Sequence, residues 1–243
     1  MLLAVDAGNT NIVFGIHDGD SWIHEWRFET FPIRNPTEYE VFLRLNFLEA
    51  NLSLDAINGV VVSSVVPQLN DILQTFTQPL FEMSPLFVAP KIYDKLPIET
   101  GNPHDIGTDL MANAVAAHSL YEGNVMVVDF GTALTFTLVN ESGKIEGVNI
   151  APGLKTAIAA LVGNTAQLPD VPLELPDSSI GKNTTHAIQA GVLWGYVSMV
   201  EGMLERIRTE YGKPINVIAT GGLSSILHPL HDQFDDVNKN LTL

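Results

Sequence analysis

Two short turns in the sequence carry the residue types that bind phosphate groups. One turn comprises residues 8–11, with the sequence GNTN, and the other comprises residues 131–133, with the sequence GTA. Tight turns of glycine and small polar residues expose backbone N–H groups, which together form a concave binding site for anions. The Walker A pattern G-x-x-x-x-G-K-S/T occurs nowhere in the sequence. We therefore expect two backbone turns to bind phosphate without a P-loop lysine.

An aspartate stands just before each turn, Asp6 before the first and Asp129 before the second. The chain has 28 acidic and 12 basic residues and a net charge of -16, so a nucleotide approaches against a repulsive field. A metal ion would supply the missing positive charge, and carboxylates are the hard oxygen ligands that Mg²⁺ or K⁺ takes. The alternative is that each aspartate only caps its own turn. Their matching positions favour the cation role.

A third carboxylate, Asp109, has two interpretations. It opens an alanine-rich stretch, residues 109–120, in which we expect a helix. Aspartate is a favoured N-cap residue, because its side chain accepts hydrogen bonds from free N–H groups of the first turn. A carboxylate at the mouth of a cleft would instead orient a substrate hydroxyl and accept its proton during phosphoryl transfer. The spacing alone leaves both interpretations open.

The elements that position these residues form a repeat. An apolar run precedes each turn, a second extended run follows it, and a third comes after a polar turn, as in a three-strand meander. The runs are residues 3–7, 12–16 and 22–28 in the first copy, and residues 127–130, 134–139 and 144–148 in the second. Two copies with matching flanks predict two lobes built on the same plan.

Helical patterns alternate with strands after each meander, which predicts mixed α/β sheets. Helices are expected at residues 37–49, 153–162 and 184–211, and short strands at residues 60–62 and 217–220. Actin-like, ribonuclease H-like ATPases have two such lobes, with helices flanking mixed sheets and the active site in the cleft between the lobes. We place an N-terminal lobe at residues 1–106 and a C-terminal lobe at residues 107–243.

Composition excludes several classes of protein. Few basic residues are available to displace phosphate counterions, so we expect no nucleic-acid partner, and an anionic membrane surface is disfavoured for the same reason. The absence of cysteine excludes disulfides, thiolate catalysis and cysteine-ligated zinc. The N-terminus has no basic region of the signal-peptide type, and no run of about 18 apolar residues could span a bilayer. We expect a cytoplasmic enzyme.

A set of motifs along the whole chain resembles type III pantothenate kinases. The motifs are D-x-G-N-T from Asp6, S-S-V-V-P from Ser63, N-P at Asn102 with G-x-D from Gly107, D-x-G-T-A-x-T from Asp129, P-G at Pro152, G-K-N-T from Gly181 and T-G-G from Thr220. The resemblance implies ATP-dependent phosphorylation of pantothenate to 4'-phosphopantothenate, the first step of coenzyme A biosynthesis. It also implies a homodimer and a requirement for Mg²⁺ and a monovalent cation, K⁺ or NH₄⁺.

The resemblance also assigns roles to individual residues. Asp109 becomes the catalytic base, Asp129 the ligand of the monovalent cation, and Asp6 a ligand of Mg²⁺ through the phosphates. The implied ATP-binding residues are Asp6, Ala7, Gly8, Asn9, Thr10, Asn11, Ile12, Val13 and Thr132. The implied substrate-binding residues are Thr100, Gly107, Thr108, Asp109, Leu110 and Thr184.

Two positions depart from the family pattern. Leu110 stands where the family usually has arginine, and Thr100 stands where it usually has an aromatic residue. Leucine cannot replace the two-pronged hydrogen bonding of arginine to a carboxylate. Two alternatives therefore remain: a catalytically decayed, nucleotide-binding regulatory relative, and a kinase of another small hydroxylated substrate. The retained aspartates favour the pantothenate kinase.

Overall fold

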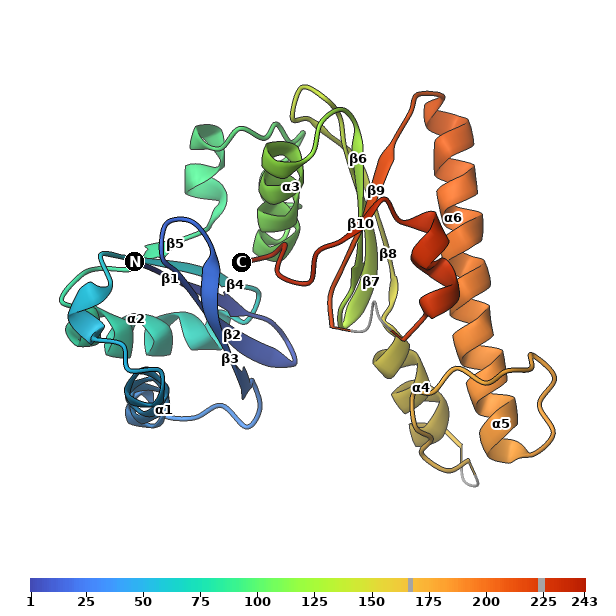
Figure 1. Cartoon of the computed structure of the whole chain (residues 1–243), viewed down its shortest axis with the longest axis horizontal. Helices are drawn as coiled ribbons and strands as arrows, with labels where there is room; N and C mark the ends of the chain where they lie inside the picture. The colour runs from blue at the N-terminus through green and yellow to red at the C-terminus, as the bar shows by residue number, and fades with distance from the viewer. Residues whose placement is uncertain (166–167, 223–225) are drawn as a thin grey trace. The chain divides into compact units, whose positions relative to one another are not determined.

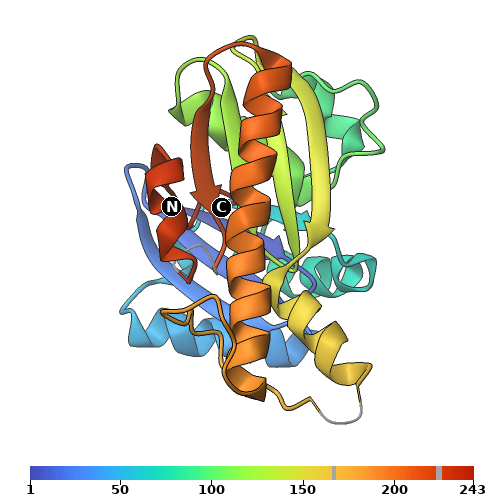
Figure 2. The same cartoon turned by 90° about the vertical axis from the view of Figure 1, so that its right-hand side faces the viewer.

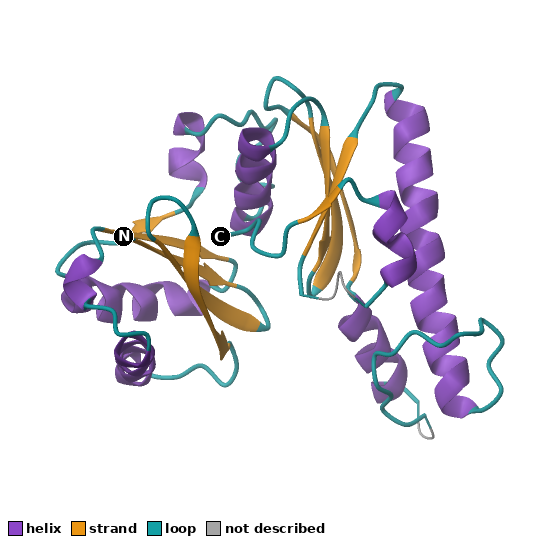
Figure 3. Cartoon of the chain, viewed as in Figure 1, coloured by secondary structure: helices purple, strands orange, loops and turns teal. Residues whose placement is uncertain are grey.

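The computed structural model describes residues 1–165, 168–222 and 226–243, and the chain divides into two compact units. Unit 1 comprises Met1–Leu96, Gly101–Ala112 and Thr242–Leu243, and unit 2 comprises Pro97–Thr100 and Asn113–Leu241. Each unit has one five-stranded sheet and helices that pack on it (Figures 1 and 3). The lobe boundary between residues 106 and 107 stays a prediction.

The sheet of unit 1 contains the first predicted meander. Strands β1 (Leu2–Ala7), β2 (Asn11–His17) and β3 (Trp22–Glu29) pair antiparallel in that order. Strands β4 (Gly59–Ser64) and β5 (Leu86–Phe87) continue the sheet beyond β1 and run parallel to it. The order is β3-β2-β1-β4-β5, and the predicted strand at residues 60–62 is confirmed as part of β4.

Two helices cover one face of this sheet. Helix α1 (Pro36–Glu49) begins at a capping box, in which Asn35 and Glu38 exchange side-chain-to-backbone hydrogen bonds of 3.1 and 3.0 Å. Helix α2 (Pro67–Phe81) was not expected from the sequence patterns, although Pro67 is a favourable first helical residue. Buried side chains of α1, α2, β1, β2 and β4 form one continuous core. Short 3-10 turns follow at Leu54–Ala56 and Pro90–Lys95.

The sheet of unit 2 repeats the plan of unit 1. Strands β6 (Val125–Phe130), β7 (Ala133–Val139) and β8 (Ile145–Pro152) form the second predicted meander. Strands β9 (Asn216–Thr220) and β10 (Asp236–Val237) run parallel to β6, which gives the order β10-β9-β6-β7-β8. Strand order and direction match those of unit 1, so the predicted repeat is confirmed.

Helices cover both faces of the unit 2 sheet. The part of α3 (Thr108–Leu120) that belongs to unit 2 packs with Val127 and Ile218 on one face. Helix α6 (Gly195–Tyr211) runs along the other face and buries Val200 and Leu204 against it (Figure 2). The predicted helices at residues 109–120, 153–162 and 184–211 are therefore confirmed, with α4 at Leu154–Gly163. The predicted helix at residues 184–211 consists of three consecutive segments. They are α5 (Thr184–Gln189), a π-helical turn (Ala190–Trp194) and α6.

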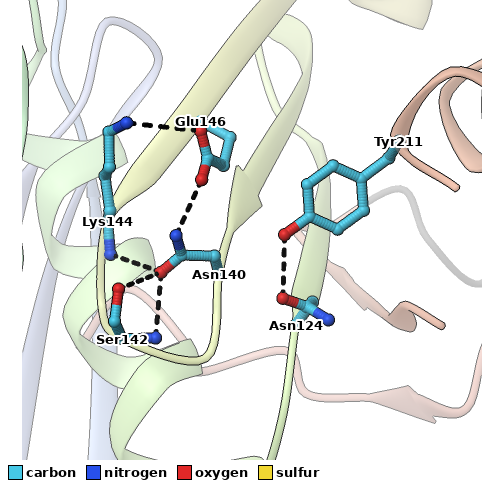
Figure 4. A network of polar contacts seen from close by, with 6 residues as sticks. All are labelled: Asn124, Asn140, Ser142, Lys144, Glu146 and Tyr211. Carbon is cyan, nitrogen blue, oxygen red and sulfur yellow. Dashed lines mark hydrogen bonds and ion pairs between the residues drawn. The ribbon is translucent and has the colours of Figure 1, made fainter. Parts of the chain in front are cut away.

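A polar network closes the far end of the second meander (Figure 4). In the β7–β8 turn, Asn140 Oδ1 accepts hydrogen bonds from the backbone N–H groups of Ser142 and Lys144 at 2.9 and 3.0 Å. The hydroxyl of Tyr211 donates to Asn124 Oδ1 at 2.8 Å and so ties the end of α6 to the start of β6. This network stabilises the end of the β6–β7 pair that lies opposite the glycine turn. A last 3-10 turn spans His228–Gln233, and within the described residues no helix is long and apolar enough to cross a bilayer.

Candidate functional site

The first glycine turn joins β1 to β2 in unit 1. The N–H of Gly8 donates to the carbonyl oxygen of Asn11 at 3.0 Å, which closes the turn. Thr30, at the end of β3, is fully buried, and its hydroxyl donates to the carbonyl oxygen of Gly8 at 2.6 Å. Its N–H donates to the carbonyl oxygen of Thr10 at 3.0 Å. Thr30 thus holds the turn in place through two hydrogen bonds to its backbone. No local sequence pattern indicated this contact.

The predicted ATP-binding residues of this turn differ in exposure. Asn9 and Thr10 are exposed at the tip, whereas Ala7, Ile12 and Val13 are buried in the sheet. A phosphate can therefore meet the last three only through their backbone groups. Such a turn can bind an anion by its N–H groups, as its residue types predicted.

The second glycine turn joins β6 to β7 in unit 2. The N–H of Gly131 donates to the carbonyl oxygen of Ala133 at 3.1 Å. The start of α4 packs directly on this turn, because the Gly153 N–H and the Thr156 hydroxyl both donate to the carbonyl oxygen of Thr132, at 3.0 and 2.8 Å. A side chain at Gly153 would collide with the backbone of Gly131 and Thr132. The glycine of the P-G motif is therefore required by close backbone packing.

Asp6 and Asp129 occupy equivalent places in the two sheets. Asp6 pairs across the strands with Val13 and Ser63. Asp129 pairs with Thr135 on β7 and with Thr220 on β9. Both aspartates are partly buried, and one residue separates each of them from its turn. The structure thus confirms that the two carboxylates are related by the repeat.

The surroundings of Asp129 fit a cation with oxygen ligands. Its Oδ2 atom accepts a hydrogen bond of 3.0 Å from the side chain of Asn113, which is 1% exposed. The hydroxyl oxygens of Thr135 and Thr220 are buried beside it and make no hydrogen bond to the described residues. Buried hydroxyls without partners are uncommon, and a carboxylate with neutral oxygens is the ligand type of K⁺ or Mg²⁺. Among the described residues there is no cluster of three or more acidic or histidine side chains that could hold a metal.

Gly221 completes the surroundings of Asp129. Its φ angle is +89°, and an added Cβ atom would lie 2.6 Å from Asp129 Oδ1. A β-carbon here would suffer both backbone strain and collision with the carboxylate. The first glycine of the T-G-G motif is thus explained by the space that the Asp129 carboxylate needs.

The start of α3 belongs to unit 1 and carries four predicted substrate residues, Gly107, Thr108, Asp109 and Leu110. The helix begins at Thr108, so Asp109 lies within the first turn and not at the N-cap position. Its Oδ1 atom accepts the N–H of Leu110 at 2.8 Å. An added Cβ at Gly107 would lie 2.6 Å from the same oxygen. The positive end of the helix dipole stabilises a carboxylate at this position.

Two neighbours, Ser63 and Tyr93, fix this helix start within unit 1. The hydroxyl of Thr108 is 3.0 Å from that of Ser63 at the end of β4. Tyr93 is 2% exposed, and its hydroxyl donates to the carbonyl oxygen of Ile106 at 3.4 Å. Burial raises the pKa of Tyr93, and the negative charge of Asp109 raises it further. Tyr93 was missed by the sequence analysis, because it is far from any motif in the chain.

The other predicted substrate residues lie elsewhere. Leu110 is 8% exposed, so its side chain belongs to the core at the helix start. Thr100 and Thr184 belong to unit 2. Thr184 is the first residue of α5 and lines an apolar pocket of about 340 Å³ together with Leu161 and Ile188. No single unit contains all the predicted substrate residues.

A family model for type III pantothenate kinases matches residues 2–206. The chain belongs to the type III pantothenate kinase family. Type III pantothenate kinases of Geobacter sulfurreducens and Myxococcus xanthus are 41% and 40% identical to it over 243 residues. The one from Phenylobacterium zucineum is 39% identical. In each of these three pairs the alignment covers 100% of this chain and 95% of the relative.

Solved structures show the same fold at low sequence identity. Component A of (R)-2-hydroxyglutaryl-CoA dehydratase from Acidaminococcus fermentans aligns with a TM-score of 0.55 at 11% identity, over 99% of this chain and 92% of its own. A Campylobacter jejuni protein described as a conserved Baf family transcriptional activator aligns with a TM-score of 0.58 at 18% identity, again over 99% and 92%. The predicted actin-like ATPase fold of this type III pantothenate kinase family member is therefore confirmed.

Proposed function

We propose that the protein transfers the γ-phosphoryl group of ATP to the hydroxyl of pantothenate and forms 4'-phosphopantothenate, the first step of coenzyme A biosynthesis. The observation that carries this proposal is the full-length similarity, at about 40% identity, to type III pantothenate kinases. The chain also retains carboxylates at the three positions that phosphoryl transfer needs, Asp6, Asp109 and Asp129.

Each carboxylate has a role in this proposal. Asp109 orients the substrate hydroxyl and accepts its proton while the hydroxyl oxygen attacks the γ-phosphorus and ADP leaves. The turns at residues 6–13 and at Thr132 bind the ATP phosphates through backbone N–H groups. Gly107, Thr108 and Thr184 contact pantothenate, with Thr100 and Leu110 at the two positions where the chain departs from the family pattern.

Two cations accompany ATP in the proposal. Asp6 would hold Mg²⁺ through the phosphates, and Asp129 would hold K⁺ or NH₄⁺ with the hydroxyls of Thr135 and Thr220. Such ions neutralise the charge that develops on the phosphoryl group. This role is supported by the oxygen-rich surroundings of Asp129 and by the net charge of -16, which leaves few basic side chains for the task.

We also propose a cytoplasmic homodimer. An added Cβ at Gly191 or Gly195 would meet no atom of the described residues within 4 Å, so no described part of the chain covers this side of the long helix. The apolar pocket that contains Thr184 and Gly191 lies on the same helix. A second copy could cover both features, as is common in symmetric dimers.

Leu110 favours one alternative, a relative that binds nucleotide without phosphorylating pantothenate. Its buried aliphatic side chain offers nothing to a carboxylate. A kinase of another small hydroxylated substrate is the remaining alternative.

A coupled assay of ADP release, with and without pantothenate, distinguishes the three functions. The pantothenate kinase releases ADP only when pantothenate is present, and mass spectrometry finds one phosphopantothenate per ADP. ATP binding without turnover would support the decayed relative. Turnover of another hydroxylated compound, with none of pantothenate, would support a different kinase.

A further inference from the structure

Asn113 on α3 is a buried polar residue that is not among the predicted site residues. Its side chain is 1% exposed, and its Nδ2 group donates a hydrogen bond of 3.0 Å to Asp129 Oδ2. Burial of a side-chain amide costs free energy unless hydrogen bonds replace those to water. Both residues belong to unit 2, and the bond joins α3 to the carboxyl end of β6. The amide of Asn113 is therefore buried against the proposed cation ligand.

Asp129 lies on the face of the unit 2 sheet that α3 covers. Two positions earlier on β6, Val127 packs with Ala117 of α3, and side chains two residues apart in a strand point to the same face. The partners of Asp129 on the neighbouring strands are Thr135 and Thr220, so their side chains share this face. Helix α3 thus covers a carboxylate with a hydroxyl on either side of it.

Three threonine hydroxyls on this face have no hydrogen-bond partner among the described residues. They belong to Thr135, Thr137 and Thr220, all of which are buried. Thr135 and Thr220 flank Asp129, and Thr137 follows Thr135 by two residues along β7. Buried hydroxyls without partners are uncommon, and their oxygen lone pairs are suited to a hard cation. The groups around Asp129 are therefore oxygens, with the Asn113 amide as a neutral donor among them.

The two carboxylate oxygens of Asp129 face different neighbours. Oδ2 accepts the hydrogen bond from Asn113, whereas Oδ1 lies 2.6 and 3.6 Å from the places that a Cβ atom would take at Gly221 and Gly131. The χ2 angle of an aspartate has a broad range when nothing holds the carboxylate. The hydrogen bond from Asn113 therefore fixes which oxygen faces the two glycines.

An amide is suited to this task because it carries no charge. A lysine or arginine at position 113 would also hold the carboxylate, but its positive charge would repel a cation and neutralise Asp129. Asparagine orients the carboxylate and leaves its negative charge for the ion.

We infer that Asn113 is a positioning residue for the monovalent-cation site, because its amide holds the Asp129 carboxylate in the orientation in which the ion binds. The inference rests on the proposed function, in which Asp129 is the ligand of K⁺ or NH₄⁺. Removal of a group that orients a metal ligand typically weakens metal binding about 10- to 100-fold. A purely structural asparagine would affect the stability of the fold and leave the affinity for the ion unchanged.

The test measures the response of the folded protein to K⁺ without relying on turnover. The full chain is melted with Mg²⁺ and a non-hydrolysable ATP analogue while K⁺ is titrated, with tetramethylammonium chloride keeping the ionic strength constant. The K⁺ concentration that gives half of the rise in melting temperature reports the affinity for the ion. Asn113→Leu removes the amide at similar volume, and Asn113→Ser is a second variant in case the first does not fold.

Asn124→Leu is the matched control. Asn124 is also a buried asparagine of unit 2, and it donates to the carbonyl oxygen of Pro214 at 3.0 Å, just before the opposite end of β6. This variant should melt at a lower temperature and keep the K⁺ concentration of half effect. The kcat of every variant is measured in parallel, at low and at saturating K⁺.

Asn113→Leu is expected to raise the K⁺ concentration of half effect about tenfold, and Asn113→Ser to raise it less. Saturating K⁺ should restore kcat to within about threefold of the unmodified protein. A lower melting temperature with an unchanged K⁺ response in the Asn113 variants would overturn the inference and make Asn113 a structural residue. No K⁺ response in the unmodified protein would overturn the cation role of Asp129 together with it. A normal K⁺ response without phosphorylation of pantothenate would instead overturn the proposed function and leave the role of Asn113 towards the ion intact.

Discussion

The sequence context of Asp109 allows two interpretations, an N-cap residue and a catalytic base. Asp109 lies in the first turn of α3, where the helix dipole favours its charge, yet it accepts the N–H of Leu110 and does not stand at the N-cap position. The hydrogen bond to Leu110 uses only one of its two oxygens. The other oxygen is the one that the proposed mechanism assigns to the substrate hydroxyl.

Replacement of Asp109 by asparagine therefore distinguishes a structural role of this residue from a role as the catalytic base. Asparagine keeps the Oδ1 acceptor, so the free energy of unfolding should change by less than about 1 kcal/mol. Loss of the base should lower kcat by about 10²–10⁴, with ATP affinity retained. Melting temperature, ATP titration and kcat are measured on the same preparation. An early-melting variant with full specific activity would make Asp109 a purely structural residue.

The surroundings of Asp129 predict dependence on a monovalent cation. With Mg²⁺ held constant, turnover in K⁺ or NH₄⁺ should exceed turnover in Na⁺ by about tenfold or more, which corresponds to ~1.4 kcal/mol of transition-state stabilisation. Potassium should also raise the melting temperature in the presence of ATP, because an ion bound only to the folded state stabilises it. Asp129→Asn should lose both effects. Equal rates in Na⁺ and K⁺ would remove the role given to Asp129.

The turn after β9 shows how an element is shaped by one neighbouring side chain. Gly221 has φ +89°, and an added Cβ would lie 2.6 Å from Asp129 Oδ1 and 2.7 Å from the carbonyl oxygen of Phe130. An added Cβ at the adjacent Gly222 would meet no atom of the described residues within 4 Å. Gly221→Ala should cost about 1–3 kcal/mol of unfolding free energy, and Gly222→Ala less than about 0.5 kcal/mol, by denaturant unfolding. Equal costs for the two variants would contradict this account of the T-G-G motif.

Tyr93, in the 3-10 turn Pro90–Lys95, is expected to make the free energy of unfolding depend on pH. Burial raises the pKa of Tyr93, with a further contribution from the charge of Asp109. The unfolded state then loses its tyrosine proton at a lower pH than the folded state, near the ordinary value of about 10. The contribution of Tyr93 to the free energy of unfolding is therefore complete below a pH of about 10, and it falls as the pH rises further.

Comparison with Tyr93→Phe isolates this effect. At neutral pH the variant should lose about 0.5–1.5 kcal/mol, the usual net contribution of a hydrogen bond. The difference between the two proteins should shrink as pH rises above about 10, measured by denaturant unfolding at each pH. A difference that stays constant across that range would show that Tyr93 does not titrate as described.

At the scale of the whole molecule, the open side of the long helix predicts association of two copies. Gly195→Tyr should shift the solution mass from dimer towards monomer in sedimentation equilibrium, because a bulky side chain would separate the two surfaces. Gly147→Tyr on β8 is the control, since its added Cβ also meets no atom within 4 Å in the part of the chain that the structure describes. Both variants should keep the circular dichroism of the folded chain. A monomeric unmodified protein, or a dimer unaffected by Gly195→Tyr, would contradict the proposal.

Most of the fold was predictable because its signals are local. Both meanders, the strands at residues 60–62 and 217–220 and the principal helices follow from apolar periodicity and glycine turns, which depend only on neighbours in the chain. Helix α2 was missed, and β5 and β10 are two residues each, too short to show a period. The motifs were sufficient to identify the family.

The sequence by itself determined the repeat, the family and the three carboxylates, because each is written in residue types at fixed spacing. Only the tertiary structure decided what surrounds them. Thr30 under the first turn, Asn113 and Thr220 beside Asp129, and Tyr93 near Asp109 come from distant parts of the chain. Such contacts depend on strand register and helix packing, which bring together residues with no local pattern in common.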